Sequence, residues 1–476
     1  MHEPSRAGDT TVHSELRPGE VAARLDRLPL RRVQWHLALA TGAAWGLAIF
    51  DDGLVAKLYP YVWSDYFGPV VYSLLNAIQI GVGILVGEYI GGYISDRFGR
   101  RFVMIISGID SGLFMLGIAF TTNPTLLGVL LFLQAMGMGG ILAAHSVYLN
   151  EIAPPRMRGR LSMGAQSITR VTSFAVIWPF FFFVPGGSPD SYRIAIFILA
   201  AAPSVVLLPI LFSIPESPRW LEAKGRMAQA RRALEKIEYR ASKRGTVPLP
   251  EPDVESREVM PIKRVPVREI FRGEYGRRSV LLLICWILGY SGVVYGFGAF
   301  YILVLDEYKF SSEFVFLTSG LTALAGGGLG FFLNSWANER IERRTSIGLA
   351  SCVFSVGVLL FYVFSGFIVH SLIVTVISVA IYFMGQTVFL FQMYNYTSAA
   401  YPTRLRSIGT GWTDGIGHLG AILGSVVVVA LFNATAGAGH IGAYIYVVVV
   451  GGLLPGVLIW RFGIRQKEAA LEEVSK

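Results

Sequence analysis

Long apolar stretches recur along the whole chain and restrict its fold more than any other feature. A helix that crosses the hydrocarbon core of a membrane needs about 20 mostly apolar residues. The sequence predicts twelve such spans, at 33–57, 68–95, 102–120, 125–149, 160–183, 193–213, 278–301, 313–334, 347–367, 372–396, 408–431 and 441–461. With 53% hydrophobic and only 15% charged residues, the composition also differs from that of water-soluble domains. We therefore expect an all-α membrane protein.

The positive charge lies in alternate breaks between the spans. The net charge of +9 would suggest nucleic acid as a partner in a water-soluble protein, but the arginines gather at 97–101, 156–160, 340–344 and 404–406. By the positive-inside rule these breaks are cytoplasmic. We expect both termini inside the cell, a multi-pass protein of the plasma membrane, and no nucleic-acid partner. The first 32 residues show no apolar core typical of a cleavable signal peptide.

One long polar segment, 214–277, divides the spans into two sets of six. It holds a helical pattern near 227–243 and then several prolines, a composition typical of a linker. The expected organisation is a cytoplasmic tail at 1–32, a six-helix bundle at 33–213, a cytoplasmic linker with short helices at 214–277, a second six-helix bundle at 278–461 and a cytoplasmic tail at 462–476.

Two charged motifs occur once in each half. Segment 92–101 reads Gly-Tyr-Ile-Ser-Asp-Arg-Phe-Gly-Arg-Arg, and 335–344 reads Ser-Trp-Ala-Asn-Glu-Arg-Ile-Glu-Arg-Arg, an offset of 243 residues. Segments 154–158 (Pro-Pro-Arg-Met-Arg) and 402–406 (Pro-Thr-Arg-Leu-Arg) are offset by 248 residues. Two motifs at nearly one offset indicate an internal duplication.

These motifs resemble those of a known family. Gly-x-x-x-Asp-Arg-x-Gly-Arg-Arg at 92–101 resembles the signature loop of the major facilitator superfamily. Segments 151–159 and 215–221 resemble motifs shared by sugar porters, bacterial aromatic-acid and nicotinate symporters, and animal organic-ion carriers. The resemblance implies twelve transmembrane helices in two pseudo-symmetric six-helix bundles. It also implies a central cavity that opens alternately to each side of the membrane.

The resemblance further implies that the charged loops act as a cytoplasmic gate. In the family, the acid at the Asp96 position pairs with arginines and a helix end, so opening must break charged contacts. The expected gate residues are Asp96, Arg97, Arg101, Glu151, Arg158, Glu339, Arg340 and Arg406. In the second copy Glu342 replaces a glycine, which predicts a looser or differently paired latch. For any single arginine, topology setting or contact with lipid phosphates is the alternative.

Acids inside the spans are candidates for proton coupling, because an intramembrane charge is costly and usually functional. Asp51 and Asp52 lie in a Phe-Asp-x-Gly pattern where similar proton symporters carry an acid. The alternative is that they cap the outer end of the helix. Many relatives pair this acid with an arginine in the fourth span, where this chain has Leu131. Arg170 in the fifth span is then the expected compensating charge, or the anchor of a substrate carboxylate.

Three further polar residues fall within spans two to four. For Glu88 and Asp110 a structural role is the favoured interpretation, and His145 is a minor candidate for moving protons.

The eleventh span carries the clearest substrate candidates. Asp414 and His418 are four residues apart, on one helical face. In similar carriers the position of His418 is commonly charged and helps to select the sign of the substrate, so histidine beside an acid leaves anions, cations and zwitterions open. Polar and aromatic residues that could complete the site, unless they only pack, are Tyr290, Tyr295, Gln386, Gln392, Asn395 and Trp412.

Taken with the resemblance, these features predict a proton-coupled symporter for a small polar organic metabolite, with an organic or aromatic acid ranked first. An organic-cation or zwitterion carrier, a drug/proton antiporter and a non-transporting receptor remain alternatives. Neither a nucleotide-binding loop nor a cluster of nucleophile, base or metal ligands is seen, which argues against ATP drive and against an enzyme. We expect no cofactor and no metal site. The expected partners are the substrate, protons and lipid, and the expected state is a monomer.

Overall fold

The computed structural model describes most of the chain, and all structural statements below concern those residues. They are 19–29, 34–46, 63, 66–68, 71, 74–75, 77–154, 161, 164–166, 168–169, 172, 191–242, 246–252, 266–297, 301, 304, 312–364, 372–401 and 403–465, with some side chains in 192–204, 267, 312–339, 372 and 403–408 left undescribed.

The first half consists of long helices close to the predicted spans. After helical residues 34–46, they are the π-helical segment η1 (Ile78–Gly83) with α4 (Ile84–Phe98), α5 (Arg100–Phe120), α6 (Pro124–Ile152), and α8 (Ser191–Ala202) with η3 (Pro203–Leu207) and α9 (Leu208–Ser213). Helix α6 begins where Asn123 accepts hydrogen bonds from the backbone N–H groups of Thr125 and Leu126, with proline in the first turn.

The second half repeats this organisation. Its helices are α12 (Gly273–Gly289) with η5 (Tyr290–Val294), α14 (Ser312–Arg340), α15 (Arg343–Val363), α17 (Leu372–Ala399), α18 (Thr403–Gly417) with α19 (Leu419–Ala434), and α20 (Ile441–Ile445) with η7 (Tyr446–Leu453) and α21 (Leu454–Phe462). Among the described residues, eight helical runs are long and apolar enough to cross a membrane. Helix α14 extends six residues beyond the predicted end, and α18 begins five residues before the predicted start.

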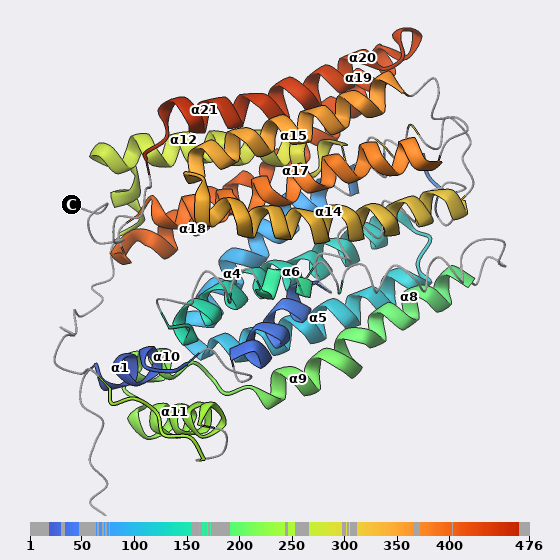
Figure 1. Cartoon of the computed structure of the whole chain (residues 1–476). Helices are drawn as coiled ribbons and strands as arrows, with labels where there is room; N and C mark the ends of the chain where they lie inside the picture. Colours follow the sequence, from blue (N-terminus) through green and yellow to red (C-terminus); the bar gives the residue numbers. More distant parts are fainter. Residues whose placement is uncertain are drawn as a thin grey trace, which may run out of the picture.

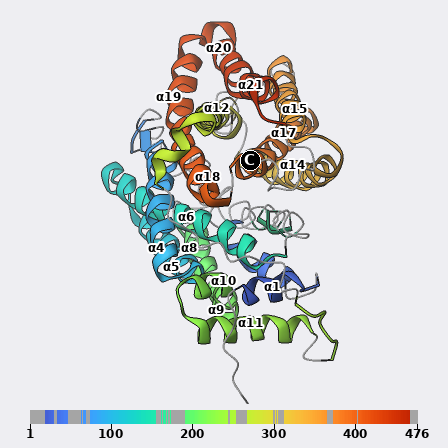
Figure 2. The ribbon, with the colours of Figure 1, turned by 90° about the vertical axis from the view of Figure 1, so that its left-hand side faces the viewer.

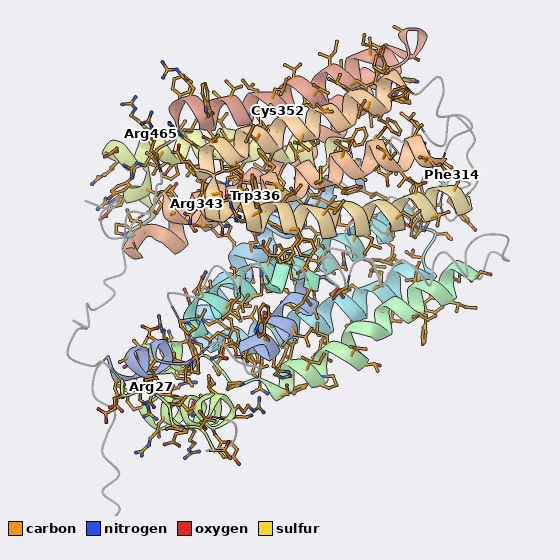
Figure 3. All side chains as sticks on the ribbon, in the orientation of Figure 1. Arg27, Phe314, Trp336, Arg343, Cys352 and Arg465 are labelled. Atoms are coloured by element: carbon orange, nitrogen blue, oxygen red, sulfur yellow. The ribbon has the colours of Figure 1, made fainter. Side chains whose placement is uncertain are left out.

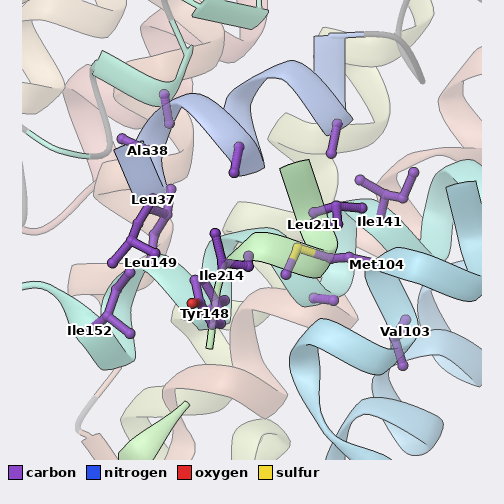
Figure 4. Packing of buried hydrophobic residues seen from close by; sticks show 14 of the residues in the cluster. Leu37, Ala38, Val103, Met104, Ile141, Tyr148, Leu149, Ile152, Leu211 and Ile214 are labelled. Carbon is purple, nitrogen blue, oxygen red and sulfur yellow. The ribbon is translucent and has the colours of Figure 1, made fainter. Parts of the chain in front are cut away.

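The two halves are separate bundles with separate cores. Figure 1 shows α4, α5, α6, α8 and α9 together on one side, and the helices from α12 to α21 together on the other. The end-on view in Figure 2 shows the same division. Each half has its own cluster of buried apolar side chains. In the first, Tyr148 packs among Leu37, Leu149, Ile152 and Ile214 (Figure 4) and donates a hydrogen bond of 2.7 Å to the carbonyl oxygen of Pro215.

Very close packing in the second half depends on two glycines. A Cβ atom on Gly292 in η5 would lie 2.2 Å from the Cα of Gly451 in η7, which is far too short for any side chain. Because small residues let helix backbones approach, this contact joins the seventh and twelfth helices at their π-helical segments.

A small helical unit projects from one end of the first half. The N-terminal helix α1 (Glu20–Asp26) lies beside α10 (Pro218–Ala223) and α11 (Met227–Ala241), as Figures 1 and 2 show. Glu238 of α11 pairs with Arg24 at 2.5 Å and with Arg27 at 2.7 Å, and Arg219 pairs with Asp26 at 2.7 Å. Figure 3 places Arg27 in this unit, with Arg343 and Arg465 toward the same end of the second half. We call this end of the molecule the basic end.

Contact between α1 and the linker helices has an electrostatic consequence. Burial alone would raise the pKa of Glu238, but the hydrogen bonds and charges of Arg24 and Arg27 outweigh it and hold the pKa below its usual value. The carboxylate is therefore ionised at neutral pH and stabilises the α1–α11 contact. The sequence predicted the linker helix near 227–243 but not its contact with the N-terminal segment.

Candidate functional site

Asp414 of α18 is held by two tyrosines. The hydroxyl of Tyr290 donates a hydrogen bond of 2.7 Å to Oδ1 of Asp414 and lies 2.9 Å from the hydroxyl of Tyr394. Tyr394 is also a hydrogen-bond partner of Asp414. Asp414 is 5% exposed, so this carboxyl is removed from bulk solvent. Three helices of the second half, α12 with η5, α17 and α18, therefore meet at one polar point.

Glu88 of the first half faces this point. Its Oε2 lies 3.0 Å from where a Cβ of Gly415 would stand, so the absence of a side chain at Gly415 makes room for the carboxyl beside Asp414. Its Oε1 is buried and has no hydrogen-bond partner among the described residues. Asp414 is the charged group that acts on Glu88 within this part of the chain. The half-buried carboxyl of Glu88 thus lies beside the buried carboxyl of Asp414 across the boundary between the halves.

Further contacts make this boundary a continuous one. The ring of Tyr89, next to Glu88, lies edge-on to Trp412 at 5.6 Å. Nearer the other end of the helices, a Cβ on Gly81 would lie 2.2 Å from Cγ1 of Ile422. Helix α4 therefore packs directly on α18, and η1 on α19. We call the contact of Glu88 and Tyr89 with Trp412, Asp414 and Gly415 the seam.

Aromatic rings surround the carboxyls. Tyr290 stacks on Trp286 at 5.1 Å and on Tyr295 at 5.7 Å, and Trp286 lies 4.8 Å from Tyr394. Tyr394 also lies edge-on to Trp45 of the first half at 6.4 Å. Tyr295 and Tyr394 pack against the cores of both halves. Planar groups from both bundles thus line the boundary, an environment suited to a flat ring.

Two histidines lie in this region, one from each half. Nδ1 of His418 lies 3.1 Å from the backbone oxygen of Asp414, and Nδ1 of His145 lies 3.0 Å from that of Leu142. Because a carbonyl oxygen only accepts, Nδ1 carries the proton in each ring, which leaves Nε2 as the acceptor or as the site of a second proton. His418 packs against Tyr290 at 4.2 Å, and His145 against Trp45 at 4.4 Å.

The amide residues predicted for the substrate site have different hydrogen-bond partners. Gln386 donates to the carbonyl oxygen of Val293 at 3.0 Å, which holds the π-helical segment η5 directly after Tyr290. Gln392 donates to Oδ1 of Asn334 at 2.8 Å and is fully buried between α14 and α17. The backbone oxygen of Asn395 accepts from Ser398. Gln392 is therefore engaged within the second bundle, while Gln386 supports the site through the backbone.

The other predicted site residues are distributed as follows. Tyr290, Tyr295, Asp414 and His418 come together in the structure, and Trp412 stands at the seam, 6.0 Å from Phe271. Asp51, Asp52 and Arg170 lie outside the described residues.

The charged loop at 92–101 is organised by Arg100, which is not among the predicted gate residues. Nη2 of Arg100 lies 2.9 Å from Oε1 of Glu151, and Nη1 lies 3.1 Å from Oδ1 of Asp96. Asp96 itself is exposed. The three groups join the end of α4, the start of α5 and the end of α6, so this network lies within the first half.

Its neighbouring arginines have other partners. Arg101 donates to the backbone oxygens of Leu211 at 3.0 Å and Phe212 at 2.8 Å, which ties α5 to the end of α9. Arg97 is exposed, with Nη1 3.4 Å from the hydroxyl of Tyr93. Arg97 and Arg101 thus have partners other than Glu151 and Asp96, and their role in the gate stays a prediction.

Glu216, from the segment 215–221, closes the turn between α4 and α5. Its Oε1 accepts from the backbone N–H of Arg100 at 3.1 Å, and its Oε2 from that of Arg101 at 3.1 Å. Burial raises the pKa of Glu216, although the N–H groups at the helix start oppose this rise. Gly99 has φ 118° and ψ 157°, a region essentially reserved for glycine, and a Cβ there would lie 2.2 Å from Oε2 of Glu216. The signature Gly and the Glu of 215–221 thus form one unit.

In the second copy, Arg340 lies over Trp336 at 5.7 Å and Glu342 lies 3.0 Å from Arg344. The side chains of Glu339 and Arg406, and all of Arg158, lie outside the described residues. In the part of the chain that the structure describes, no three His, Cys, Asp or Glu residues are grouped as metal ligands.

Comparison with known proteins gives a consistent result. The family model of the Major Facilitator Superfamily matches residues 42–425. The niacin transporter NiaP of Acinetobacter baylyi is 24% identical over 88% of this chain and 92% of its own length. The 4-hydroxybenzoate transporter PcaK of the same organism is 25% identical over 87% of this chain and 88% of its own length. The inward-open structure of the xylose transporter XylE from E. coli has a TM-score of 0.65, at 17% identity, and covers 92% of this chain and 97% of that one.

The motifs that the sequence analysis matched to a family are therefore confirmed at the level of the whole chain, and the fold is the expected two-bundle helical membrane fold. This chain belongs to the Major Facilitator Superfamily, and it is a membrane transporter rather than an enzyme.

Proposed function

We propose that this transporter moves a small aromatic carboxylate across the plasma membrane by alternating access, coupled to protons. The observation that carries the proposal is the aromatic boundary between the halves, where Trp286, Tyr290, Tyr295 and Tyr394 surround a polar point. A planar ring can stack there while its polar substituent meets hydroxyl groups. The relatives named for niacin and 4-hydroxybenzoate support this substrate class, because both names denote a carboxylate on a flat ring.

Proton coupling in this proposal depends on acids of the first span. Asp51 is the proposed coupling acid of the first span, with Asp52 beside it, and Arg170 is the proposed partner of the substrate carboxylate. An anion that enters a centre already holding Glu88 and Asp414 needs compensating charge. A bound proton together with Arg170 supplies it, so substrate and proton are expected to travel together. With the basic end in the cytoplasm, as the positive-inside rule requires, symport with protons that enter from an acidic exterior carries the substrate inward.

A second candidate is an organic-cation carrier. It is favoured by the same two carboxyls, because aromatic rings together with acids form a typical site for a cationic ring. Under this alternative Asp414 and Glu88 bind the substrate charge directly. Exchange of a proton for the cation would then replace symport.

Three ligands of one ring size separate these candidates. Purified protein in liposomes is given nicotinate, nicotinamide or 1-methylnicotinamide, which carry a negative, no and a positive charge. We expect uptake of nicotinate driven by an acidic exterior and abolished by a protonophore. Uptake of 1-methylnicotinamide without nicotinate would replace the acid proposal by the cation carrier. If neither nicotinate nor 1-methylnicotinamide is transported, and 4-hydroxybenzoate is not transported either, both candidate functions are rejected.

Single substitutions test the residue roles. Arg170→Gln should raise the KM for nicotinate at least about tenfold, the loss of one charged contact of about 1.4 kcal/mol or more. Arg232→Gln, on the exposed face of α11, is the matched control and should leave the KM unchanged. Asp51→Asn should abolish uphill accumulation yet keep part of the nicotinate exchange. Normal proton-driven accumulation by Asp51→Asn would remove this acid from the coupling mechanism.

A further inference from the structure

The seam brings together two acids that neither the family motifs nor the sequence analysis paired. Glu88 and Asp414 are 326 positions apart and belong to different bundles, yet Gly415 admits the Glu88 carboxyl beside Asp414. Asp414 is satisfied by tyrosine hydroxyls, whereas Oε1 of Glu88 is buried without a partner among the described residues. A carboxyl oxygen that is buried without a donor disfavours the ionised form of its group.

Among the described residues, the surroundings offer donors of hydrogen bonds to Asp414 but no Lys or Arg side chain to balance a second anion. The titratable groups on the described elements packed about the pair are Tyr89, His145, Tyr290, Tyr394 and His418. His418 and His145 are each bound to their own helix through Nδ1. No lysine or arginine of the described residues is among the charges that act on either acid. Two ionised carboxyls at this place would repel each other with little screening.

We propose that Glu88 and Asp414 bind a single proton between them and that this proton holds the seam closed. With the proton bound, only one carboxyl is charged, and Tyr290 and Tyr394 can stabilise it. When the proton leaves, two anions face each other across the boundary between the bundles, and α4 separates from α18. The proton passes to water that enters from the opening end, and its return closes the seam. This inference rests on the proposed proton coupling and adds a second proton site to it, on the interface itself.

The position of the pair sets which end responds. Glu88 is ten residues before Phe98, where α4 ends, and Asp414 is eleven residues after Thr403, where α18 begins. At 1.5 Å per residue both lie about 15 Å from the basic end. Separation of α4 from α18 at this depth opens the basic end of the molecule. Loss of the proton is therefore expected to open the seam toward the basic end.

The test needs no substrate. Spin labels are placed on Lys224→Cys, in the exposed α10–α11 turn, and on Arg277→Cys, exposed near the start of α12, with the exposed Cys352 changed to serine. Both labels lie at the basic end, one on each half. Pulsed electron–electron double resonance then measures the distance between the two labels at several pH values from about pH 5 to about pH 9. A transition that releases one proton changes its equilibrium by up to about tenfold per pH unit. We expect a longer-distance population to grow as the pH rises.

Variants identify the acids responsible. In Glu88→Gln and in Asp414→Asn the distance distribution should no longer change with pH, because one anion alone has no partner to repel. Asp110→Asn is the matched control. Asp110 is a half-buried acid of α5 whose carboxyl lies against Gly137 of α6 and makes none of the seam contacts described above, so this variant should respond to pH like the parent.

Either of two results overturns the proposal. One is a label distance in the parent that does not change with pH. The other is a normal pH response in whichever of Glu88→Gln and Asp414→Asn elutes as a monodisperse protein. Because no ligand is used, these results are independent of the nicotinate assay. A transporter that carries nicotinate but fails here loses only the seam proton site, and one that passes here but carries no aromatic acid loses only the proposed substrate.

Discussion

Gly99→Ala tests the reasoning about the charged turn most directly. Gly99 occupies a backbone conformation that other residues essentially do not adopt, which costs about 1–3 kcal/mol for alanine. Its new Cβ would also lie 2.2 Å from Oε2 of Glu216. Displacing this carboxylate exposes the N–H groups at the start of α5, and loss of such a cap costs about 1 kcal/mol. The expected destabilisation is therefore about 2–4 kcal/mol.

Gly92→Ala is the control, because Gly92 lies in the interior of α4 with nothing within 4 Å of its Cβ position. Alanine there should stabilise the helix by about 1 kcal/mol. For a domain of about 200 residues, 1 kcal/mol shifts the melting temperature by about 2–4 °C. In one detergent, intrinsic-fluorescence melting should place Gly99→Ala at least about 4 °C below the parent and Gly92→Ala at or above it. A Gly99→Ala protein as stable as Gly92→Ala would refute the account of this turn.

Two further predictions concern contacts outside the site. Because Arg24 holds the pKa of Glu238 below its usual value, the contact of α1 with α11 is present above the ordinary carboxyl pKa and is lost as the pH falls through the lowered one. In the parent protein, hydrogen exchange of the α1 amides, corrected for the intrinsic rate, should thus become faster below about pH 4.5. In Glu238→Gln it should already be fast at neutral pH. Equal protection of these amides in parent and variant would contradict this. Gly292→Ala should cost about 1–3 kcal/mol through its contact with Gly451, seen as a lower melting temperature, whereas Gly411→Ala, in open space, should not lower it.

The sequence predicts the helical architecture well because one physical requirement, burial of apolar residues in a membrane, acts along the whole chain. Each described long helix coincides with a predicted span. The ends differ where the helix continues beyond the apolar run: α14 reaches Arg340, six residues past the predicted limit, because a helix can extend into water without apolar residues.

The site is predictable only where its members are neighbours in sequence. Asp414 and His418 share a helix face, so their spacing is informative. Glu88 has no such neighbour, and its sequence context favours a structural role until folding places it against α18. Gln392 shows the opposite case, since a lone amide in an apolar helix gives no sign that Asn334 is its partner.

Adjacent arginines show a similar limit. Arg100 and Arg101 point about 100° apart on α5, so one meets Glu151 while the other meets the end of α9. The motif predicts that a charged network forms. Which arginine pairs with Glu151 depends on how α5 lies between its neighbouring helices.

The attachment of α1 and the linker helices to the first bundle has a practical consequence for imaging. Arg24, Arg27 and Asp26 bind α1 to α10 and α11, and the indole N–H of Trp220 in α10 donates to the backbone oxygen of Asp96 at the end of α4. A fiducial fused to α11, or an antibody fragment raised against it, would therefore be fixed to one bundle and would report that bundle's orientation. Particles aligned on such a marker would show the movement of the other bundle directly.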